Sequence, residues 1–153
     1  MTIERVTEAD LAELLPLMRA YCDFYEVAPS DEALLSLSRA LIADHEHEGV
    51  QLLARNEGRA VGFATIFWSW ATTSADRIGV MNDLYVAPEA RGTGVAEALI
   101  DACGAECAVR GAGKLTWQTA PENAAAIKLY ERVSATREQW VDYWLPVEPK
   151  LST

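Results

Sequence analysis

The sequence predicts a single α/β domain built around a mixed β-sheet. Three observations support this prediction. The chain has 153 residues, which favours one domain and is long enough to bury a core. Half of the residues are hydrophobic, so the chain is not of the disordered class. Segments with the period of a strand and segments with the period of a helix follow one another in the order β, α, α, β, β, β, α, β, α, β.

The first half of the chain predicts three strands and two helices. TIERVT is a short strand, and Thr7 is placed to cap a helix that runs to Tyr25. Pro16 lies inside this helix and should kink or interrupt it. Ser30 caps a second helix that runs to about Ala43. A hairpin follows in residues 49–70, with its turn at NEGR, and its second strand is apolar on both sides, which indicates a strand covered on both faces.

The second half alternates strands and helices. A strand is expected over residues 77–86 and a helix over residues 93–110, ended by the GAG sequence. KLTWQTA is the next strand, and PENAAAIKLYERVSA is a helix with its proline near the start. EQWVDYWLPV is a last strand, and EPKLST is expected to be a frayed tail. The expected domain spans residues 1–148, followed by a tail of residues 149–153.

Net charge and termini limit the kinds of partner. The 13 basic and 23 acidic residues give a formal charge of −10, which argues against a general nucleic-acid binder. The acidity is compatible with a cationic partner, although it also serves solubility. MTIERVTEAD lacks the apolar core of a signal peptide, and no apolar run is long enough to cross a bilayer. We therefore expect a cytoplasmic protein that binds neither nucleic acid nor membrane.

The cysteines and histidines do not predict a metal site. Cys103 and Cys107 are four residues apart and share a helix face, but no further ligand stands in local spacing with them. Cys22 makes the number of cysteines odd, so the three are interpreted as core residues rather than a disulfide framework. His45 and His47 flank Glu46 and are interpreted as part of a solvated helix end.

The stretch LYVAPEARGTGVAEALI is where a strand turns into a helix. A helix N-terminus offers unpaired N–H groups to an anion, glycine lets the backbone approach it, and Arg91 adds a charged fork. A dinucleotide fingerprint is excluded because Glu97 occupies its third glycine position, and no P-loop sequence occurs. Taken alone, the stretch is equally compatible with a tight structural turn.

Two motifs together give a resemblance to a known family. NDLYVAPEARGTGVAEALI resembles the acetyl-coenzyme A motif of the GNAT superfamily of N-acetyltransferases, through Arg91, Gly94 and Ala96. TWQTAPENAAAIKLYERVSA resembles the later family pattern, met here by Asn123, Ala126 and Tyr130. The resemblance covers nearly the whole chain. It implies a GNAT-like domain with a central mixed, twisted sheet and helices on both faces.

The resemblance implies acetyl-CoA as cosubstrate, with no metal, and a set of residues that hold it. In the family, the strand before the glycine turn carries a bulge and separates from the next strand, which opens a slot for the cofactor. Asn123 would hydrogen-bond the cofactor near the pantetheine, and Ala126 belongs to the same motif. The pantetheine arm would pair with the backbone of Leu84, Tyr85 and Val86. The turn would hold the pyrophosphate through Arg91, Gly92, Thr93, Gly94, Val95 and Ala96.

The implied chemistry is acyl transfer to an amine, which needs a base, donors to the oxyanion and an acid for the leaving thiolate. Tyr130 is the predicted acid, since a tyrosine has a pKa near ~10; its structural alternative is a core aromatic. Asp83 is the predicted base or amine-attracting carboxylate, with Glu26 and Asp142 as alternatives. The family places the oxyanion donor at the backbone N–H of Tyr85 or a neighbour.

The acceptor side is predicted to combine aromatic rings with carboxylates, which suits an ammonium group. The expected function is N-acetylation of a primary amine by direct attack in a ternary complex. The amine would be a small molecule such as a polyamine or an amino acid, or a basic peptide. The alternatives are a non-catalytic acyl-CoA-binding sensor or interaction module, and an unrelated α/β protein. The sequence WVDYW could form a homodimer seam. The predicted acceptor residues are Tyr25, Glu26, Trp68, Trp70 and Asp142.

One departure from the family pattern predicts a local cost. Ser134 stands where relatives often have glycine at a helix end. Serine pays more than glycine for a left-handed conformation there, so this helix end should be strained or different.

Overall fold

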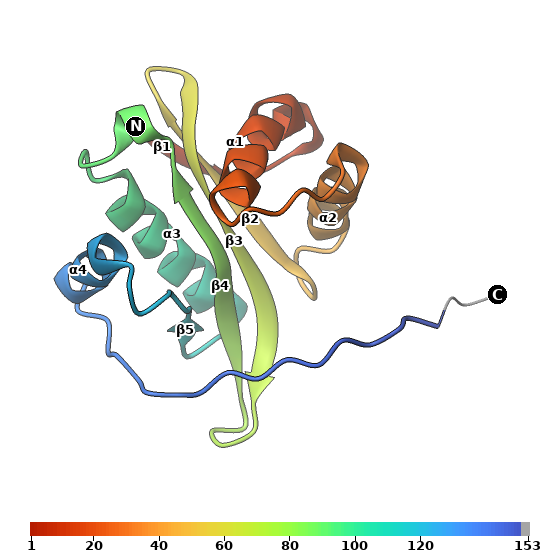
Figure 1. Ribbon diagram of the computed structural model, residues 1–153, viewed down its shortest axis with the longest axis vertical. Helices are drawn as coiled ribbons and strands as arrows, with labels where there is room; N and C mark the ends of the chain where they lie inside the picture. The colour runs from red at the N-terminus through yellow and green to blue at the C-terminus, as the bar shows by residue number, and fades with distance from the viewer. Residues whose placement is uncertain (151–153) are drawn as a thin grey trace. The chain divides into compact units, whose positions relative to one another are not determined.

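The structure is a computed structural model and describes residues 1–150. Internal contacts divide the chain into two units, Met1–Ala120 and Pro121–Thr153, and each is described by itself. The first unit holds nearly all of the regular structure, and the second holds one helix (Figure 1). The elements of the first unit are β1 (Thr2–Arg5), η1 (Glu8–Asp10), α1 (Leu11–Phe24), α2 (Asp31–Ala43), β2 (Gly49–Asn56), β3 (Arg59–Ala71), β4 (Asp76–Val86), η2 (Pro88–Ala90), α3 (Val95–Arg110) and β5 (Leu115–Thr116). The second unit contains α4 (Ala124–Arg132).

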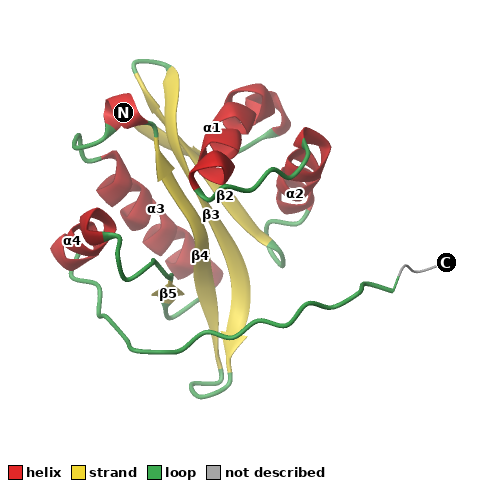
Figure 2. Ribbon diagram, in the orientation of Figure 1, coloured by secondary structure: helices red, strands yellow, loops and turns green. Residues whose placement is uncertain are grey.

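The first unit is built on a five-stranded sheet in the order β1-β2-β3-β4-β5. The first four strands pair antiparallel, and β5 pairs parallel with β4, so the sheet is mixed as predicted. Helices α1 and α2 cover one face and α3 covers the other (Figure 2). The predicted fold class, an α/β domain with helices on both faces of a mixed sheet, is confirmed.

Both faces of the sheet are packed with apolar side chains. On the α1–α2 face, Leu14, Leu53 and Phe63 are fully buried, and on the α3 face Ile66 and Leu99 are. The three cysteines are free and buried, as the sequence predicted. Burial raises the pKa of the Cys103 thiol to about 12, so this group is not a nucleophile at neutral pH.

The predicted Ser30 cap and the predicted hairpin are present, whereas Thr7 precedes the short helix η1 and Asp10 is the N-cap of α1. The Ser30 hydroxyl accepts a hydrogen bond from the Ala33 N–H at 3.1 Å and starts α2. The turn between β2 and β3 has positive φ at both Glu57 and Gly58 (50° and 77°). Two such residues in a two-residue loop match the right-handed twist of the flanking strands.

Four predicted boundaries need correction. Helix α1 continues through Pro16 without a break, because Leu14, Leu17 and Met18 are buried on its inner side and hold it against the sheet. Strand β5 is limited to Leu115–Thr116, and α4 begins at Ala124 instead of residue 121. The predicted last strand is not formed, since residues 135–150 contain neither helix nor strand.

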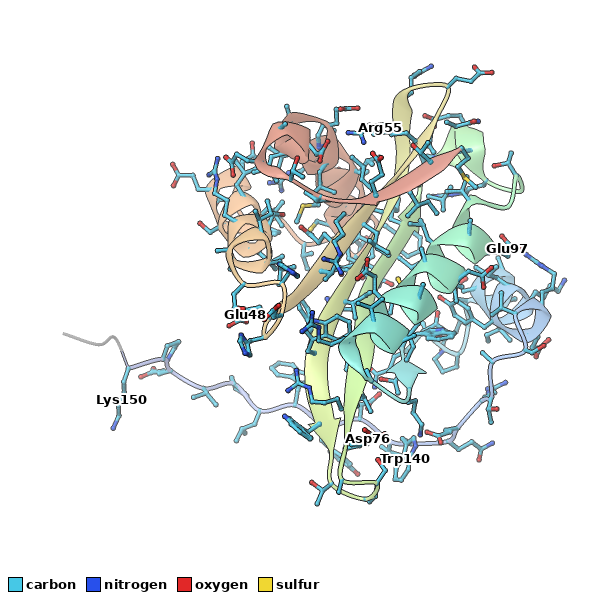
Figure 3. All side chains as sticks on the ribbon, turned by 180° about the vertical axis from the view of Figure 1, so that it is seen from behind. Glu48, Arg55, Asp76, Glu97, Trp140 and Lys150 are labelled. Atoms are coloured by element: carbon cyan, nitrogen blue, oxygen red, sulfur yellow. The ribbon has the colours of Figure 1, made fainter. Side chains whose placement is uncertain are left out.

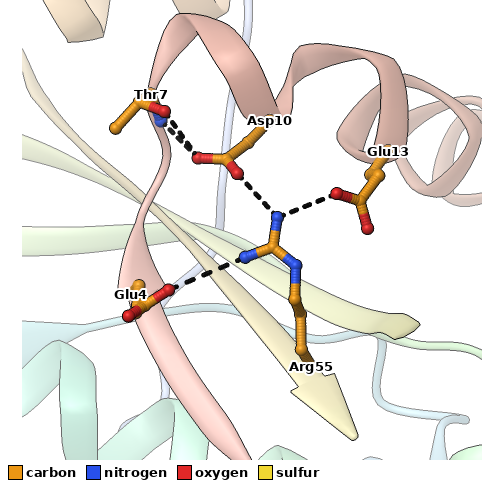
Figure 4. A network of polar contacts seen from close by, with 5 residues as sticks. All are labelled: Glu4, Thr7, Asp10, Glu13 and Arg55. Carbon is orange, nitrogen blue, oxygen red and sulfur yellow. Dashed lines mark hydrogen bonds and ion pairs between the residues drawn. The ribbon is translucent and has the colours of Figure 1, made fainter. Parts of the chain in front are cut away.

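A charged network fastens the start of α1 to the end of β2 (Figure 4). The Arg55 guanidinium donates to Asp10 at 2.6 Å and to Glu13 at 3.0 Å, and Glu4 lies 3.7 Å away. Burial raises the pKa of Asp10, but hydrogen bonds from Thr7 and Arg55 outweigh it and hold the pKa below its usual value. This acidic cluster therefore has a structural role, because its carboxylates converge on one arginine.

Ser134, at the end of α4, has the left-handed backbone conformation for which the sequence analysis predicts strain. Ser134 has φ of 61°, and the Ala135 N–H bonds to the Tyr130 carbonyl at 3.1 Å, which is the pattern of a Schellman cap. We expect Ser134→Gly to increase the free energy of unfolding of the chain by about 0.5–1 kcal/mol, because glycine adopts positive φ without strain. Urea unfolding measures this. The control Ser36→Gly, inside α2, should destabilise instead; equal signs for the two variants would contradict the prediction.

Candidate active site

Strand β4 carries a bulge at the point where its chemistry-bearing residues begin. Thr65 of β3 pairs with Asp83, whereas the next residue, Ile66, pairs with Met81, so Asn82 is an extra residue on β4. A bulge of this kind bends its strand and re-aims the neighbouring side chains. The bulge that the family resemblance implied is therefore present.

From the bulge to Val86, the edge of β4 that faces away from β3 pairs with no described strand. Its pairing with β5 is confined to Gly79 and Val80, so the stretch to Val86 continues beyond the described part of β5 (Figure 1). The Ala87 N–H bonds to β3 at the Val61 carbonyl, at 2.8 Å. Backbone groups alternate along a strand, so those of Leu84 and Val86 point away from β3, towards the open edge. This edge can accept an extended ligand as if it were another strand.

The RGTG turn follows directly and forms the start of α3. Gly92 and Gly94 have φ of 75° and 89°, and the Thr93 hydroxyl donates to the Ala90 carbonyl. The first hydrogen bond of the helix runs from the Ala98 N–H to the Gly94 carbonyl. The N–H group of Val95 therefore lies before the first hydrogen-bonded turn of the helix. Such N–H groups, together with the helix dipole, attract an anion.

Arg91 joins this turn to the open edge of β4. Its Nε donates to the Val86 carbonyl at 3.0 Å, and its guanidinium lies 5.9 Å from the centroid of the Tyr85 ring. The side chain is exposed, and its Nη groups add positive charge beside the helix N-terminus. The open edge, the turn and Arg91 are the parts that a long ligand with a phosphate group would need.

Asp83 lies at the bulge within a cluster of polar side chains on the α1–α2 face. Its carboxylate is hydrogen-bonded by Thr65 and Tyr21, and by the Asn82 amide at 2.9 Å. Burial raises the pKa of Asp83, and the hydrogen bonds counteract that shift only in part. A carboxylate with a raised pKa is better suited than an exposed one to accept a proton near neutral pH.

Tyr21, on α1, is hydrogen-bonded to the Asp83 carboxylate. Its hydroxyl is within hydrogen-bond reach of both the Asp83 carboxylate and the Asn82 carbonyl, the latter at 3.2 Å. Burial and the nearby Asp83 raise the pKa of Tyr21 above its usual value of 10.0. Tyr21 therefore stays protonated at neutral pH and acts as a donor that positions Asp83.

A buried row of polar residues crosses three strands to reach Asp83. Gln51 of β2 pairs with Thr65 of β3, which pairs with Asp83 of β4. The Gln51 Nε2 donates to the Thr65 hydroxyl oxygen at 3.2 Å, and the exposed fractions of the two residues are 3% and 0%. Because an ionised carboxylate can only accept hydrogen bonds, the Thr65 hydroxyl donates its proton to Asp83.

The structure brings only some of the predicted acceptor residues to this cluster. The Tyr25 ring lies 5.0 Å from that of Tyr21, and Glu26 follows with φ of 57° at the end of α1. Trp68 is buried, with its indole N–H bonded to the His45 carbonyl at 2.8 Å, and Trp70 stacks with Arg77. Both tryptophans alternate with Thr65 along β3, so they lie on the opposite face of the sheet from Asp83.

The remaining predicted residues belong to the second unit. Asn123 caps α4, since its side-chain oxygen accepts from the Ala126 N–H at 3.2 Å. Its side-chain amide N–H₂ is a separate donor group. Tyr130 is half-buried on the same helix, and Asp142 is exposed in the segment that follows it.

The sequence analysis missed three residues of the Asp83 cluster: Tyr21, Thr65 and Gln51. A signal for two of them existed, because Gln51 and Thr65 are polar residues inside otherwise apolar strands, and buried polar residues need partners. Among residues 1–150, no three or more His, Cys, Asp and Glu side chains are grouped to hold a metal ion. No helix in this part of the chain has the length and apolarity needed to cross a membrane.

Comparison with known proteins gives consistent results. Residues 14–134 match the Acetyltransferase (GNAT) family. YhfO of Bacillus subtilis (strain 168), named as an uncharacterized N-acetyltransferase, is 32% identical over 151 residues, which are 98% of this chain and 100% of the relative. A crystal structure reported as a probable acetyltransferase is 29% identical with a TM-score of 0.80, covering 98% of this chain and 100% of that one.

A further solved structure shows the same fold with a ligand. It is AAC(6')-Iy in complex with the bisubstrate analogue CoA-S-monomethyl-acetylneamine. Its TM-score is 0.84 at 19% identity, and the match covers 95% of this chain and 97% of that chain. At this identity the likeness concerns the fold alone.

Proposed function

The chain belongs to the Acetyltransferase (GNAT) family and is an enzyme of the acyltransferase type, and we propose that it transfers the acetyl group of acetyl-CoA to a primary amine. The observation that carries this proposal is the position of Asp83. A half-buried carboxylate with a raised pKa lies on β4, one residue before the open edge that leads to the RGTG turn. The proposal includes direct attack of the amine in a ternary complex.

The open edge and the turn support acetyl-CoA as the cosubstrate. The thioester supplies the activated acetyl group when the cosubstrate is bound. In our proposal the backbone of Leu84–Val86 pairs with the pantetheine arm, and the residues from Arg91 to Ala96 hold the pyrophosphate. Asn123 and Ala126 on α4 complete the cofactor contacts in this proposal.

The proton transfers follow from the chemistry of the amine. Asp83 takes one proton from the ammonium, directly or through one water, which frees the nitrogen lone pair for attack on the acetyl carbon. The new C–N bond forms and the C–S bond breaks. The backbone N–H of Leu84, a neighbour of Tyr85 that points to the open edge, stabilises the negative charge on the acetyl oxygen, whereas the Tyr85 N–H points towards β3. Tyr130 gives its proton to the leaving sulfur. The amide nitrogen then loses its second proton to the Tyr130 phenolate, and Asp83 releases its proton to solvent.

The surroundings of Asp83 support a cationic acceptor. Phe24, Tyr25 and Val27 are exposed at the end of α1, next to Glu26. Aromatic faces and carboxylates attract an ammonium group, and the carbonyl end of a helix adds partial negative charge. Our proposal keeps Tyr25, Glu26 and, on the second unit, Asp142. It leaves Trp68 and Trp70 out because they lie on the other face of the sheet.

We propose a small-molecule amine, such as a polyamine or an amino acid, or a basic peptide as the acceptor. The experiment is a free-thiol release assay with acetyl-CoA across amino acids, polyamines, aminoglycosides and basic peptides, with the acetylated product identified by mass spectrometry. We expect one acetylated amine per thiol released for at least one class. Binding of acetyl-CoA without release for any class would replace the proposal with a non-catalytic acyl-CoA-binding module. The cytoplasmic location and the homodimer expected from the sequence stay predictions.

The Thr65 hydroxyl provides a test through pH. Its hydrogen bond lowers the pKa of Asp83 against the effect of burial, so Thr65→Val should raise that pKa further. Because Asp83 must be ionised to accept a proton, the acid limb of the kcat/KM profile should move to higher pH. A hydrogen bond to an ionised group is worth about 1.5–3 kcal/mol, so kcat/KM on the acid limb should fall by about tenfold.

The pH profile of Thr65→Ser is the matched control, since serine keeps the hydroxyl. We expect its acid limb to coincide with that of the wild type. A Thr65→Val enzyme whose acid limb does not move would separate Asp83 from the titration and count against its role as the base.

A further inference from the structure

A cavity of about 240 Å³ lies at the edge of the sheet, where β1 ends and α2 packs on the start of β2. All of its lining residues belong to the first unit. Figure 3 shows this part of the chain, with the labelled Glu48 directly before the first residue of β2. Exposed residues of the segment around the end of β1 form its mouth, and its interior is buried. The buried lining residues are Val6, Ser38, Leu41, Val50 and Gln51.

The side-chain amide of Gln51 directs an oxygen without a partner towards this cavity. Its Nε2 donates to the Thr65 hydroxyl oxygen at 3.2 Å, and the Thr65 hydroxyl donates to Asp83, which fixes the orientation of the amide. The Gln51 Oε1 is buried and accepts no hydrogen bond from any residue among 1–150. Because β3 lies on one side of β2 and the cavity on the other, this oxygen faces the cavity. A buried oxygen of this kind needs a donor.

Ser38 of α2 supplies a second acceptor beside Gln51. Its exposed fraction is 0%, and its hydroxyl donates to the Met18 sulfur at 3.5 Å. The Gln51 Nε2 lies 4.0 Å from the same sulfur, so the two polar groups are neighbours. With its proton directed to the sulfur, the Ser38 oxygen keeps its lone pairs for a ligand. The cavity therefore presents two acceptor oxygens close together.

The size and lining of the cavity select the chemistry of its occupant. Its volume equals that of about eight water molecules in the liquid, but its apolar walls offer so many waters too few polar partners. An aliphatic body suits these walls, and one –NH₂ group supplies an N–H to each of the two oxygens. An ammonium ion would be buried beside Arg5 with no carboxylate among the lining residues, and a carboxylate would bring no donor.

We propose that this cavity is a binding site for a small neutral molecule that carries a primary amide on a short aliphatic body. The two N–H groups of the ligand are donated to the Gln51 Oε1 and the Ser38 Oγ. Its carbonyl oxygen faces the mouth of the cavity and the solvent. The site lies on the opposite side of Gln51 from Thr65 and Asp83, so it is separate from the proposed acetyl-transfer site. The inference does not depend on acetyl transfer.

The test is a titration of the ¹⁵N-labelled full chain with isobutyramide, followed by ¹H–¹⁵N correlation spectra. We expect saturable shifts, largest for the amides of Ser38, Leu41 and Gln51, with a Kd on the order of 1–10 mM. 3-Methyl-2-butanone has the same shape with a methyl group in place of –NH₂. Because it donates no hydrogen bond, it should bind at least about tenfold more weakly, as should isobutyrate. Equal affinities for the amide and the ketone, or shifts that avoid the cavity, would overturn the proposal.

Two substitutions test the two acceptor oxygens separately. Gln51→Met keeps the length of the side chain without Oε1, so the Kd for isobutyramide should rise by about tenfold while the affinity for the ketone is kept. Ser38→Ala removes the second acceptor and should raise that Kd by at least about threefold. Ser36→Ala is the matched control, because Ser36 is exposed on the same helix, and it should bind like the wild type.

The Ser38→Ala result decides the question if Gln51→Met does not give the spectrum of a folded chain. Wild-type affinity for isobutyramide in Ser38→Ala, or in a folded Gln51→Met, would mean that the amide does not bind through these oxygens and would overturn the assignment.

Discussion

Replacing Asp83 by Asn is expected to lower kcat by about 10²–10³-fold. Asparagine keeps the shape of the side chain and its place beside Asn82 and Tyr21, but its amide cannot accept the proton of the ammonium. The rate should no longer rise through the acid limb seen for the wild type. The KM for acetyl-CoA should change little, because the carboxylate of Asp83 points to the α1–α2 face and takes no part in the cofactor contacts that we propose.

The measurement is the initial rate of thiol release between pH 5 and 10, with the best amine from the panel. Asp76→Asn is the matched control, since Asp76 is an exposed carboxylate at the other end of β4. We expect wild-type rates for this control. Equal rates for Asp83→Asn and Asp76→Asn would exclude Asp83 as the base and move the role to another carboxylate, with Glu26 and Asp142 as the next to replace.

Replacing Gly94 by Ala is expected to weaken acetyl-CoA binding by about tenfold. Gly94 has φ of 89° at the start of α3, and a Cβ added there would meet no atom within 4 Å. The cost is therefore conformational: an L-residue in this region pays about 1–2 kcal/mol, and the turn can relax in the absence of ligand. Binding would then have to restore the strained turn, so the loss appears in the affinity.

Isothermal titration calorimetry with acetyl-CoA measures this loss. Gly104→Ala offers a matched control on the same helix, because Gly104 also has open space around it but lies inside α3 with no positive φ. That variant should bind acetyl-CoA like the wild type and stabilise the fold by about 0.5–1 kcal/mol. If Gly94→Ala binds acetyl-CoA with unchanged affinity, the RGTG turn is not the pyrophosphate site.

Local signals in the sequence were enough to predict much of the fold. Ser30, the NEGR turn and the GAG sequence each place a boundary through their own backbone chemistry, and the structure has those boundaries. The predicted interruption at Pro16 is absent, because the packing of α1 against the sheet outweighs a local preference. The prediction of a last strand was wrong: the sequence is apolar and strand-like, but a strand needs a partner, and none of the described strands pairs with residues 135–150.

The candidate site likewise has parts that local sequence signals predict and parts that they do not. The glycine turn is a local motif and was predicted from Arg91 and Gly94. The Gln51–Thr65–Asp83 row is formed by three strands whose register no local pattern encodes, so Thr65 and Gln51 were missed. Trp68 and Trp70 were assigned to the acceptor side from the family resemblance and their residue type. Both alternate with Thr65 along β3, so they lie on the opposite face of the sheet from Asp83. The face of the sheet to which each strand residue points can be counted from the sequence only after one residue of that strand has been assigned to a face.

The central claim is that acetyl-CoA binds along the open edge of β4 and over the start of α3. The most direct test is a ¹H–¹⁵N correlation spectrum of the labelled chain, titrated with coenzyme A. We predict that the largest amide shifts fall on Leu84, Val86, Gly94, Val95 and Ala96, and that β1 and α2 are unaffected. Saturable binding with these five amides unmoved would contradict the account.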